Sequence, residues 1–203
     1  TAWFGFVPLI HIWLNESPKE SARWSFLSAV IANFISFYWI GLNSGATLFP
    51  VLLSLISCII YLSSMWAIIG WSIAFLEKRS ANALAMIPFI WVTFEWLRSF
   101  GPLGFPWANL AITQTKFLPV LQIIDTTGSE GVGFWILLLN TLIYLLFRYN
   151  NFNKKFISIL VIVFLIPWIF GTLRLQSYEK KEIQNTRNVS AIQPNINPNQ
   201  KWD

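Results

Sequence analysis

Long apolar runs separated by short polar loops dominate the chain. A hydrocarbon core about 30 Å thick needs roughly 20 helical residues at about 1.5 Å each, and every run is long enough, or nearly so, to cross it. The runs are Phe26–Leu42, Leu48–Leu76, Ala83–Leu97, Val132–Phe147 and Phe156–Leu173. The alternating segments of a β-barrel are missing from the sequence. Because lipid offers no partner to open backbone groups, the pattern predicts an all-α polytopic membrane bundle of about five complete spans.

Two further apolar stretches do not have the length or composition of spans. Trp3–Leu14 is too short to cross a bilayer, and we interpret it as the tail of a helix that begins before Thr1. Leu110–Thr127 is interrupted by polar residues, and it follows Gly101–Asn109, whose two prolines and two glycines break any helix. We therefore expect a re-entrant or interfacial segment whose open backbone is buried in protein or lines a cavity.

Composition indicates a membrane protein, and charge predicts its orientation. Hydrophobic residues make up 55% of the chain and charged residues only 11%, a balance unsuited to a water-exposed surface. One alternate set of loops carries Lys19, Arg23, Lys78, Arg79, Arg148, Lys154 and Lys155. The other set carries only Arg98 and Lys116, so the first set should face the cytoplasm and the C-terminal tail should leave on the opposite side. The net charge of +5 thus reflects topology, and no basic-aromatic stripe indicates nucleic-acid binding.

The helix end before the broken loop carries the candidate functional residues. Glu95 and Arg98 lie three apart on one helix face, and they are either an ion pair that snorkels at the interface or a functional pair. Trp107, in the loop, belongs either to an aromatic belt or to a functional site. Cys58 lies mid-helix and is typical of a small buried hydrophobe. With one His and one Cys, the sequence offers no metal cluster.

The chain changes character near residue 176. We place a transmembrane helical bundle at 1–176, followed at 177–203 by a linker and the beginning of a soluble domain. Asn188–Gln193 alternates as a short strand does, and a Pro- and Asn-rich loop follows it. By themselves these residues predict the edge of an α/β or β-rich domain, truncated at Asp203.

Several motifs in order along the chain resemble the apolipoprotein N-acyltransferase family. They are Phe4-Gly-Phe-Val-Pro8, the helix end from Trp91 through Glu95-Trp-Leu-Arg98, Gly104-Phe-Pro-Trp107, Gly128-Ser-Glu-Gly-Val-Gly133, and Val189-Ser-Ala-Ile-Gln193 followed by Lys201-Trp202-Asp203. Each motif is short, but their order extends over nearly the whole chain. The tail falls where the nitrilase-like domain of that family, an α/β carbon-nitrogen hydrolase fold, begins.

The resemblance implies a multi-pass enzyme of the bacterial inner membrane, with its tail on the periplasmic side and no cofactor. Such an enzyme moves an acyl chain from a phospholipid to the lipidated N-terminal cysteine of an apolipoprotein. The resemblance also implies that a Glu, a Lys and a Cys of the nitrilase-like domain carry out the reaction. We expect these three beyond Asp203, so this fragment should be inactive alone.

The resemblance further implies that the bundle supplies a groove for the two lipid substrates, the phospholipid acyl donor and the diacylglyceryl apolipoprotein acceptor. Trp107 and Trp202 match tryptophans of the family, and we expect them to shape the substrate entrance. Arg98 and Glu95 are further candidates for substrate contact, Arg98 by pairing with a lipid phosphate.

Two other functions fit the same pattern of spans. A secondary transporter should carry ionisable or helix-breaking residues at mid-membrane and an internal repeat, whereas Glu95 and Arg98 lie near a helix end and no repeat is visible. A non-catalytic membrane anchor for a soluble partner is the other alternative. The residues that follow Asp203 would distinguish the enzyme from both.

Overall fold

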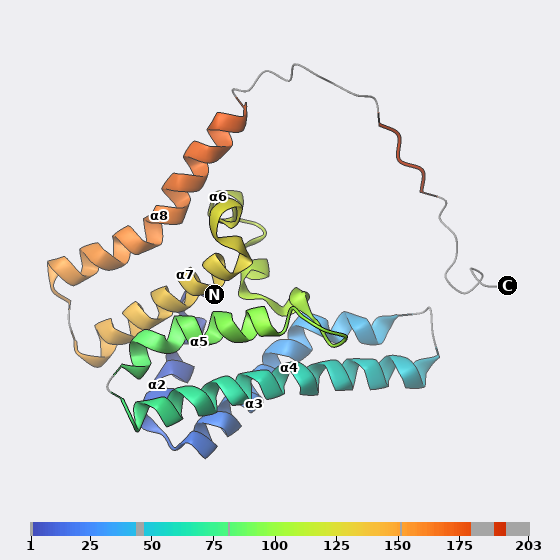
Figure 1. The fold of residues 1–203 in the computed structure, drawn as a ribbon, viewed down its shortest axis with the longest axis horizontal. Coiled ribbons are helices and arrows are strands. Elements are labelled where there is room, and N and C mark those ends of the chain that lie inside the picture. The colour runs from blue at the N-terminus through green and yellow to red at the C-terminus, as the bar shows by residue number, and fades with distance from the viewer. Residues whose placement is uncertain (1, 44–46, 81, 151, 180–188, 194–203) are drawn as a thin grey trace.

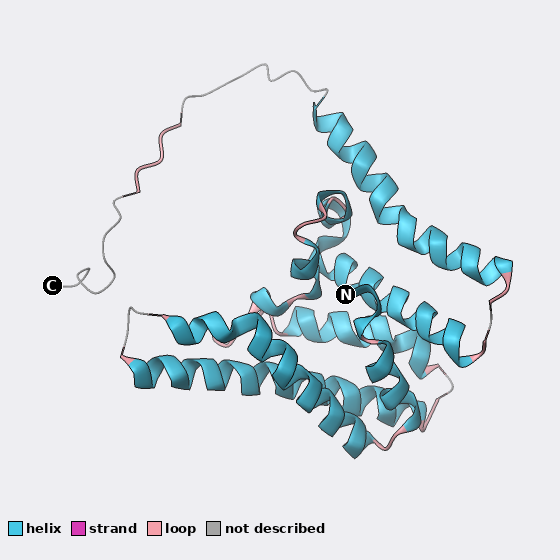
Figure 2. Ribbon diagram, turned by 180° about the vertical axis from the view of Figure 1, so that it is seen from behind, coloured by secondary structure: helices cyan, strands magenta, loops and turns pink. Residues whose placement is uncertain are grey.

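The computed structural model describes residues 2–43, 47–80, 82–150, 152–179 and 189–193, and the ordered elements among them are helices (Figures 1 and 2). The α-helices are α1 Ala2–Gly5, α2 Val7–Asn15, α3 Pro18–Phe37, α4 Leu48–Glu77, α5 Ala83–Leu97, α6 Leu118–Leu121, α7 Ile124–Arg148 and α8 Lys154–Glu179. The 3-10 helices are η1 Tyr38–Leu42, η2 Pro106–Ala108 and η3 Leu110–Gln114. The predicted all-α class is confirmed.

The predicted number of spans is not confirmed. By length and composition, four helical stretches could cross a membrane: Pro18–Leu42, Leu48–Glu77, Ile124–Arg148 and Lys154–Tyr178. Helix α5 has only 15 residues and falls short. At about 1.5 Å per residue it is roughly 22 Å long, less than a hydrocarbon core of about 30 Å. The Gly- and Pro-rich loop ends it after Leu97, before it can reach span length.

The first two helices lie inside the bundle. α2 packs against α3, α4 and α7, and α1 packs against α7. Asn140 of α7 joins the two short helices, since its amide oxygen accepts the Phe6 N–H (2.8 Å) and its amide nitrogen donates to the Ala2 carbonyl (2.8 Å). Trp13 is fully buried and donates to the Ser25 hydroxyl (2.7 Å), so it is a core residue. The apolar segment that is too short to span therefore forms part of the core.

α7 is the centre of the bundle and α8 its periphery. Half of the most apolar stretch of α7 is buried, against 11% for α8, which Figure 1 shows diverging from the other helices. Gly128 has a positive φ of 69° and kinks α7, so the regular helix starts after it. Glu130 therefore lies in the first turn of that regular helix, where the helix dipole favours a negative charge.

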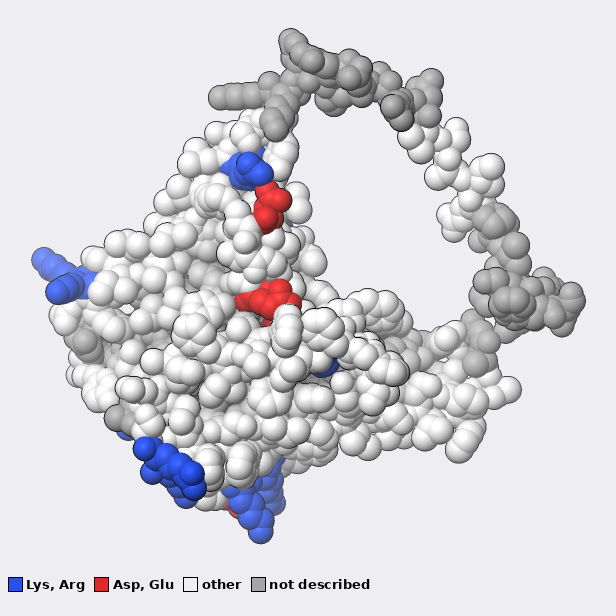
Figure 3. Space-filling model, in the orientation of Figure 1, with Lys and Arg blue, Asp and Glu red and all other residues white. Residues whose placement is uncertain are grey.

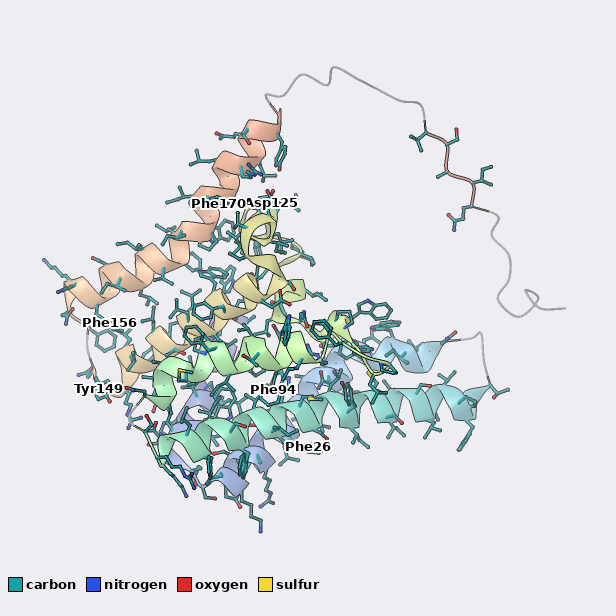
Figure 4. All side chains as sticks on the ribbon, in the orientation of Figure 1. Phe26, Phe94, Asp125, Tyr149, Phe156 and Phe170 are labelled. Atoms are coloured by element: carbon teal, nitrogen blue, oxygen red, sulfur yellow. The ribbon has the colours of Figure 1, made fainter. Side chains whose placement is uncertain are left out.

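The predicted re-entrant segment consists of short pieces, η3 and α6, which pack on α7 and α8. A Cβ atom at Gly171 would lie 1.7 Å from the Pro119 carbonyl oxygen, so α8 approaches this segment at backbone distance. Arg174 of α8 forms an ion pair with Asp125, whose side chain Figure 4 labels near Phe170. These contacts join the segment to α8.

The tail gives no support to the predicted strand. Residues 189–193 form no strand, and Val189 and Ile192 are almost fully exposed, while the rest of the predicted segment lies outside the described residues. A strand is defined by pairing with a neighbour, and no pairing partner lies among the described residues. The division at residues 176 and 177 remains a prediction, and α8 continues three residues past it, to Glu179.

Candidate functional site

A groove of about 890 Å³ lies between the N-terminal helices, α3 and the segment after α5. We call it the main groove. Its apolar walls include Phe6, Leu9, Phe37, Trp66 and Phe117. Its other wall is the segment from Trp107 to Gln114, which contains the end of the broken loop. The helix break makes this wall possible, because Pro102 and Pro106 cannot continue α5 and the chain leaves the direction of that helix.

Glu95 fixes the broken loop from behind. Its side chain is only 2% exposed, although Glu95 is the third residue from the end of α5. Its Oε1 accepts the Leu110 N–H (2.8 Å). Leu110 starts η3 and lines the main groove, whereas Glu95 does not. The carboxylate therefore holds the groove wall in place through the backbone.

Arg98 makes a second attachment to the same wall. It is 5% exposed, and its Nη2 donates to the Asn109 Oδ1 (2.7 Å). Its own carbonyl accepts the Phe105 N–H (3.0 Å), which closes the loop onto the helix end. The structure therefore does not show Glu95 and Arg98 as an exposed ion pair at the membrane interface. Both side chains are buried, and of the ion pairs among the described residues none joins Glu95 to Arg98.

The Glu95 carboxylate is packed against α7. A Cβ atom at Gly133 would lie 2.8 Å from Glu95 Oε2, so glycine at this position leaves the space that the carboxylate fills. Glu95 Oε2 and Arg98 Nε have no hydrogen-bond partner among the described residues. The Glu95 carboxylate and the Arg98 guanidinium lie in the same buried region, so each offsets part of the desolvation cost of the other.

Trp107 stands at the open edge of the main groove. Its side chain is 61% exposed, and its ring lies 6.3 Å from Trp39 and 5.8 Å from Phe105, centre to centre. Phe105 in turn contacts Phe37 edge-on (5.3 Å). These four rings form an aromatic rim. The sequence did not indicate that Trp39 or Phe37 belongs to the site, because the chain contains many other aromatic residues. Trp202, the other predicted entrance residue, lies outside the described residues.

The described lining of the main groove lacks the thiol and the ionisable side chains of covalent catalysis. The described residues that line it include no Cys, Lys, Asp or Glu. Cys58, the only cysteine of the chain, is half-buried in α4, packs against the cluster of Phe37 and Leu55, and does not itself line the groove. Among the described lining residues, therefore, no nucleophile faces a base, as covalent catalysis would require.

Comparison with known proteins shows which family has this segment of the chain. The family model described as "Apolipoprotein N-acyltransferase N-terminal domain" matches residues 1–142. The chain belongs to the apolipoprotein N-acyltransferase family. The matched residues include α1 to α6 and most of α7, and hence the whole main groove and its rim.

Full-length relatives of the same family extend the match to the tail. The chain is 30% identical to the apolipoprotein N-acyltransferase of Geobacter metallireducens, with 100% of this chain and 40% of that protein covered. It is 27% identical to the Chlorobaculum tepidum protein, with coverage of 100% and 38%, and 26% identical to the Coxiella burnetii protein, with coverage of 96% and 41%. The chain thus spans about 40% of the length of these relatives. No solved structure gives a significant match.

Proposed function

We propose that this chain is the membrane part of an N-acyltransferase that moves an acyl chain from a phospholipid to the lipidated N-terminal cysteine of apolipoproteins. The observation that carries the proposal is the main groove with its aromatic rim, built from the segment that the family model matches. The volume of about 890 Å³ lies within the range of pockets that bind small molecules, about 300–1,000 Å³.

The chemistry of the substrates explains why such a groove is needed. The acyl chains of the phospholipid and of the diacylglyceryl apolipoprotein stay in the bilayer, while their reactive ends meet at its surface. A groove that is apolar along Phe6 and Leu9 and opens at Trp107 gives those chains a mainly apolar path. Trp107 and, by family resemblance, Trp202 shape the entrance. Glu95 and Arg98 act on the substrate indirectly, by fixing the wall.

In this proposal the catalytic Glu, Lys and Cys belong to the nitrilase-like domain of the full-length protein. A nucleophile, its base and the donors that stabilise the oxyanion must lie within hydrogen-bond reach of one another. A separate soluble domain supplies that geometry, and the main groove supplies none of these groups.

The proposal is tested by acyl labelling. Full-length protein incubated with phospholipid carrying a radiolabelled acyl chain should acquire label that hydroxylamine releases, since a thioester is labile to it, and should pass the label to a diacylated lipopeptide. Residues 1–203 alone should acquire none. Label on Cys58 of the shorter chain would contradict the assignment of the nucleophile to the soluble domain. A full-length protein that acquires no label would contradict the proposed activity.

The inner membrane is the proposed location, with the basic loops on the cytoplasmic side. The two sides of α4, which is long enough to span, offer a direct test, because Thr47 precedes the helix and Asn82 lies in the loop after it, and both are exposed. In a Cys58→Ser background, Thr47→Cys should react with a membrane-impermeant maleimide added to spheroplasts. Asn82→Cys should react only after the membrane is permeabilised. The reverse labelling would mean the opposite orientation.

A further inference from the structure

A second groove, of about 660 Å³, lies between α2 and α7 at the opposite end of α7 from the Gly128 kink. We call it the basic-end groove. One part of its lining is apolar, with Val7, Pro8 and Ile12 from α2 and Phe147 from α7. None of these residues except Pro8 lines the main groove. The basic-end groove is therefore a separate site.

Polar groups gather where the groove reaches the end of the bundle. The buried Tyr144 hydroxyl accepts from Arg148 Nη1 (2.8 Å) and from Asn15 Nδ2 (3.3 Å), which holds both donors at the same place. His11 also lines this part, and its carbonyl accepts from Asn15 Nδ2 (2.7 Å). The cluster is rich in donors, and Arg148 keeps further N–H groups for a ligand.

The charge around the groove favours an anion. Lys19, Arg23, Lys78, Arg79, Arg148, Lys154 and Lys155 belong to the helix ends and loops at this end, with only Glu16, Glu20 and Glu77 to oppose them. Figure 3 shows basic side chains gathered along this side of the molecule. Glu20 pairs with Arg23, and in the part of the chain that the structure describes no carboxylate lies within 4.0 Å of Arg148.

We propose that the basic-end groove binds an anionic phospholipid, with the phosphate at Arg148 and an acyl chain along Val7 and Phe147. A guanidinium forms strong, charge-assisted hydrogen bonds to phosphate oxygens. The change from an apolar wall to a donor cluster along one groove matches the order of chain and head group in a phospholipid. A basic helix end at a membrane surface attracts anionic lipids for the same electrostatic reason.

Photo-crosslinking of the full-length protein in detergent micelles tests the site. A photoreactive phenylalanine at Phe147, which is 64% exposed, should capture phosphatidylglycerol about ten-fold more than phosphatidylcholine. The same residue placed at Phe49, which is 77% exposed at the start of α4, serves as the control position and should show no such preference. Equal capture of the two lipids at Phe147, or a second protein copy as the main product, would overturn the proposal.

Two charge variants distinguish a specific lipid site in the groove from attraction of anionic lipid to the basic end as a whole. Arg148→Gln should lower phosphatidylglycerol capture about ten-fold. Arg79→Gln, at the same end but stacked on Phe75 outside the groove, should change it less than about two-fold. Equal losses in both variants would mean attraction by the basic end as a whole. Full competition by millimolar inorganic phosphate would mean a site for free anions; either result rejects the phospholipid site.

Discussion

Replacing Glu95 with alanine should lower the free energy of unfolding by about 3 kcal/mol, because it leaves the buried Arg98 uncompensated and the Leu110 N–H without an acceptor. The wall of the main groove then loses its attachment to α5. A shift of about 1 Å in a positioning element can reduce turnover about a hundred-fold, and we expect a loss of that size in acyl transfer. Unfolding in mixed micelles and transfer to a diacylated lipopeptide measure the two effects.

Two further variants resolve the cause. Glu95→Gln keeps an oxygen that can accept the Leu110 N–H but removes the charge, so its effect should lie between those of wild type and Glu95→Ala. Glu77→Ala, at the last residue of α4 and outside this network, should change stability by less than about 0.5 kcal/mol. If Glu95→Ala proves as mild as Glu77→Ala, the carboxylate does not hold the groove wall.

Replacing Trp107 with alanine should reduce acyl transfer about ten-fold or more while leaving the fold intact. The side chain is 61% exposed, so its removal costs little buried surface. What it removes is one edge of the aromatic rim, next to Trp39 and Phe105, where the proposed lipid substrates enter the main groove. The assay is the initial rate of transfer at saturating and limiting lipid, with unfolding measured in parallel.

Trp96 provides a matched control for Trp107. It lies at the C-terminal end of α5, from which the loop with Trp107 leaves, and it is 52% exposed. Its ring contacts Phe100 edge-on at 4.7 Å, and it does not line the main groove. An ordinary interfacial tryptophan contributes little to activity, so Trp96→Ala should retain most of the transfer rate. Trp168 is unsuitable as a control because it packs against Trp3 and Phe117. Similar small losses at Trp107 and Trp96 would assign Trp107 to the aromatic belt.

The sequence by itself determined the helices and the place where they break. Apolar runs over Leu48–Leu76 and Phe156–Leu173 predict α4 to within one residue and the start of α8 to within two, since any apolar helix in lipid must satisfy its own backbone. The glycines and prolines of Gly101–Asn109 predict the loop that ends α5. These features are local, because propensity and backbone hydrogen bonding act over a few residues. The ordered motifs also indicated the family, which the comparisons confirm.

Only the tertiary structure decided which side of each helix meets protein. A helix that is apolar all round has no polar face to mark its exposed side, so the sequence could not show that Trp13 is buried or that α8 is peripheral. It also could not show where Glu95 and Arg98 point. Their spacing suggested a pair with each other, whereas the fold gives each a partner 11 or 15 residues away, at Asn109 and Leu110. Such partners depend on how the loop folds back, which no local pattern encodes.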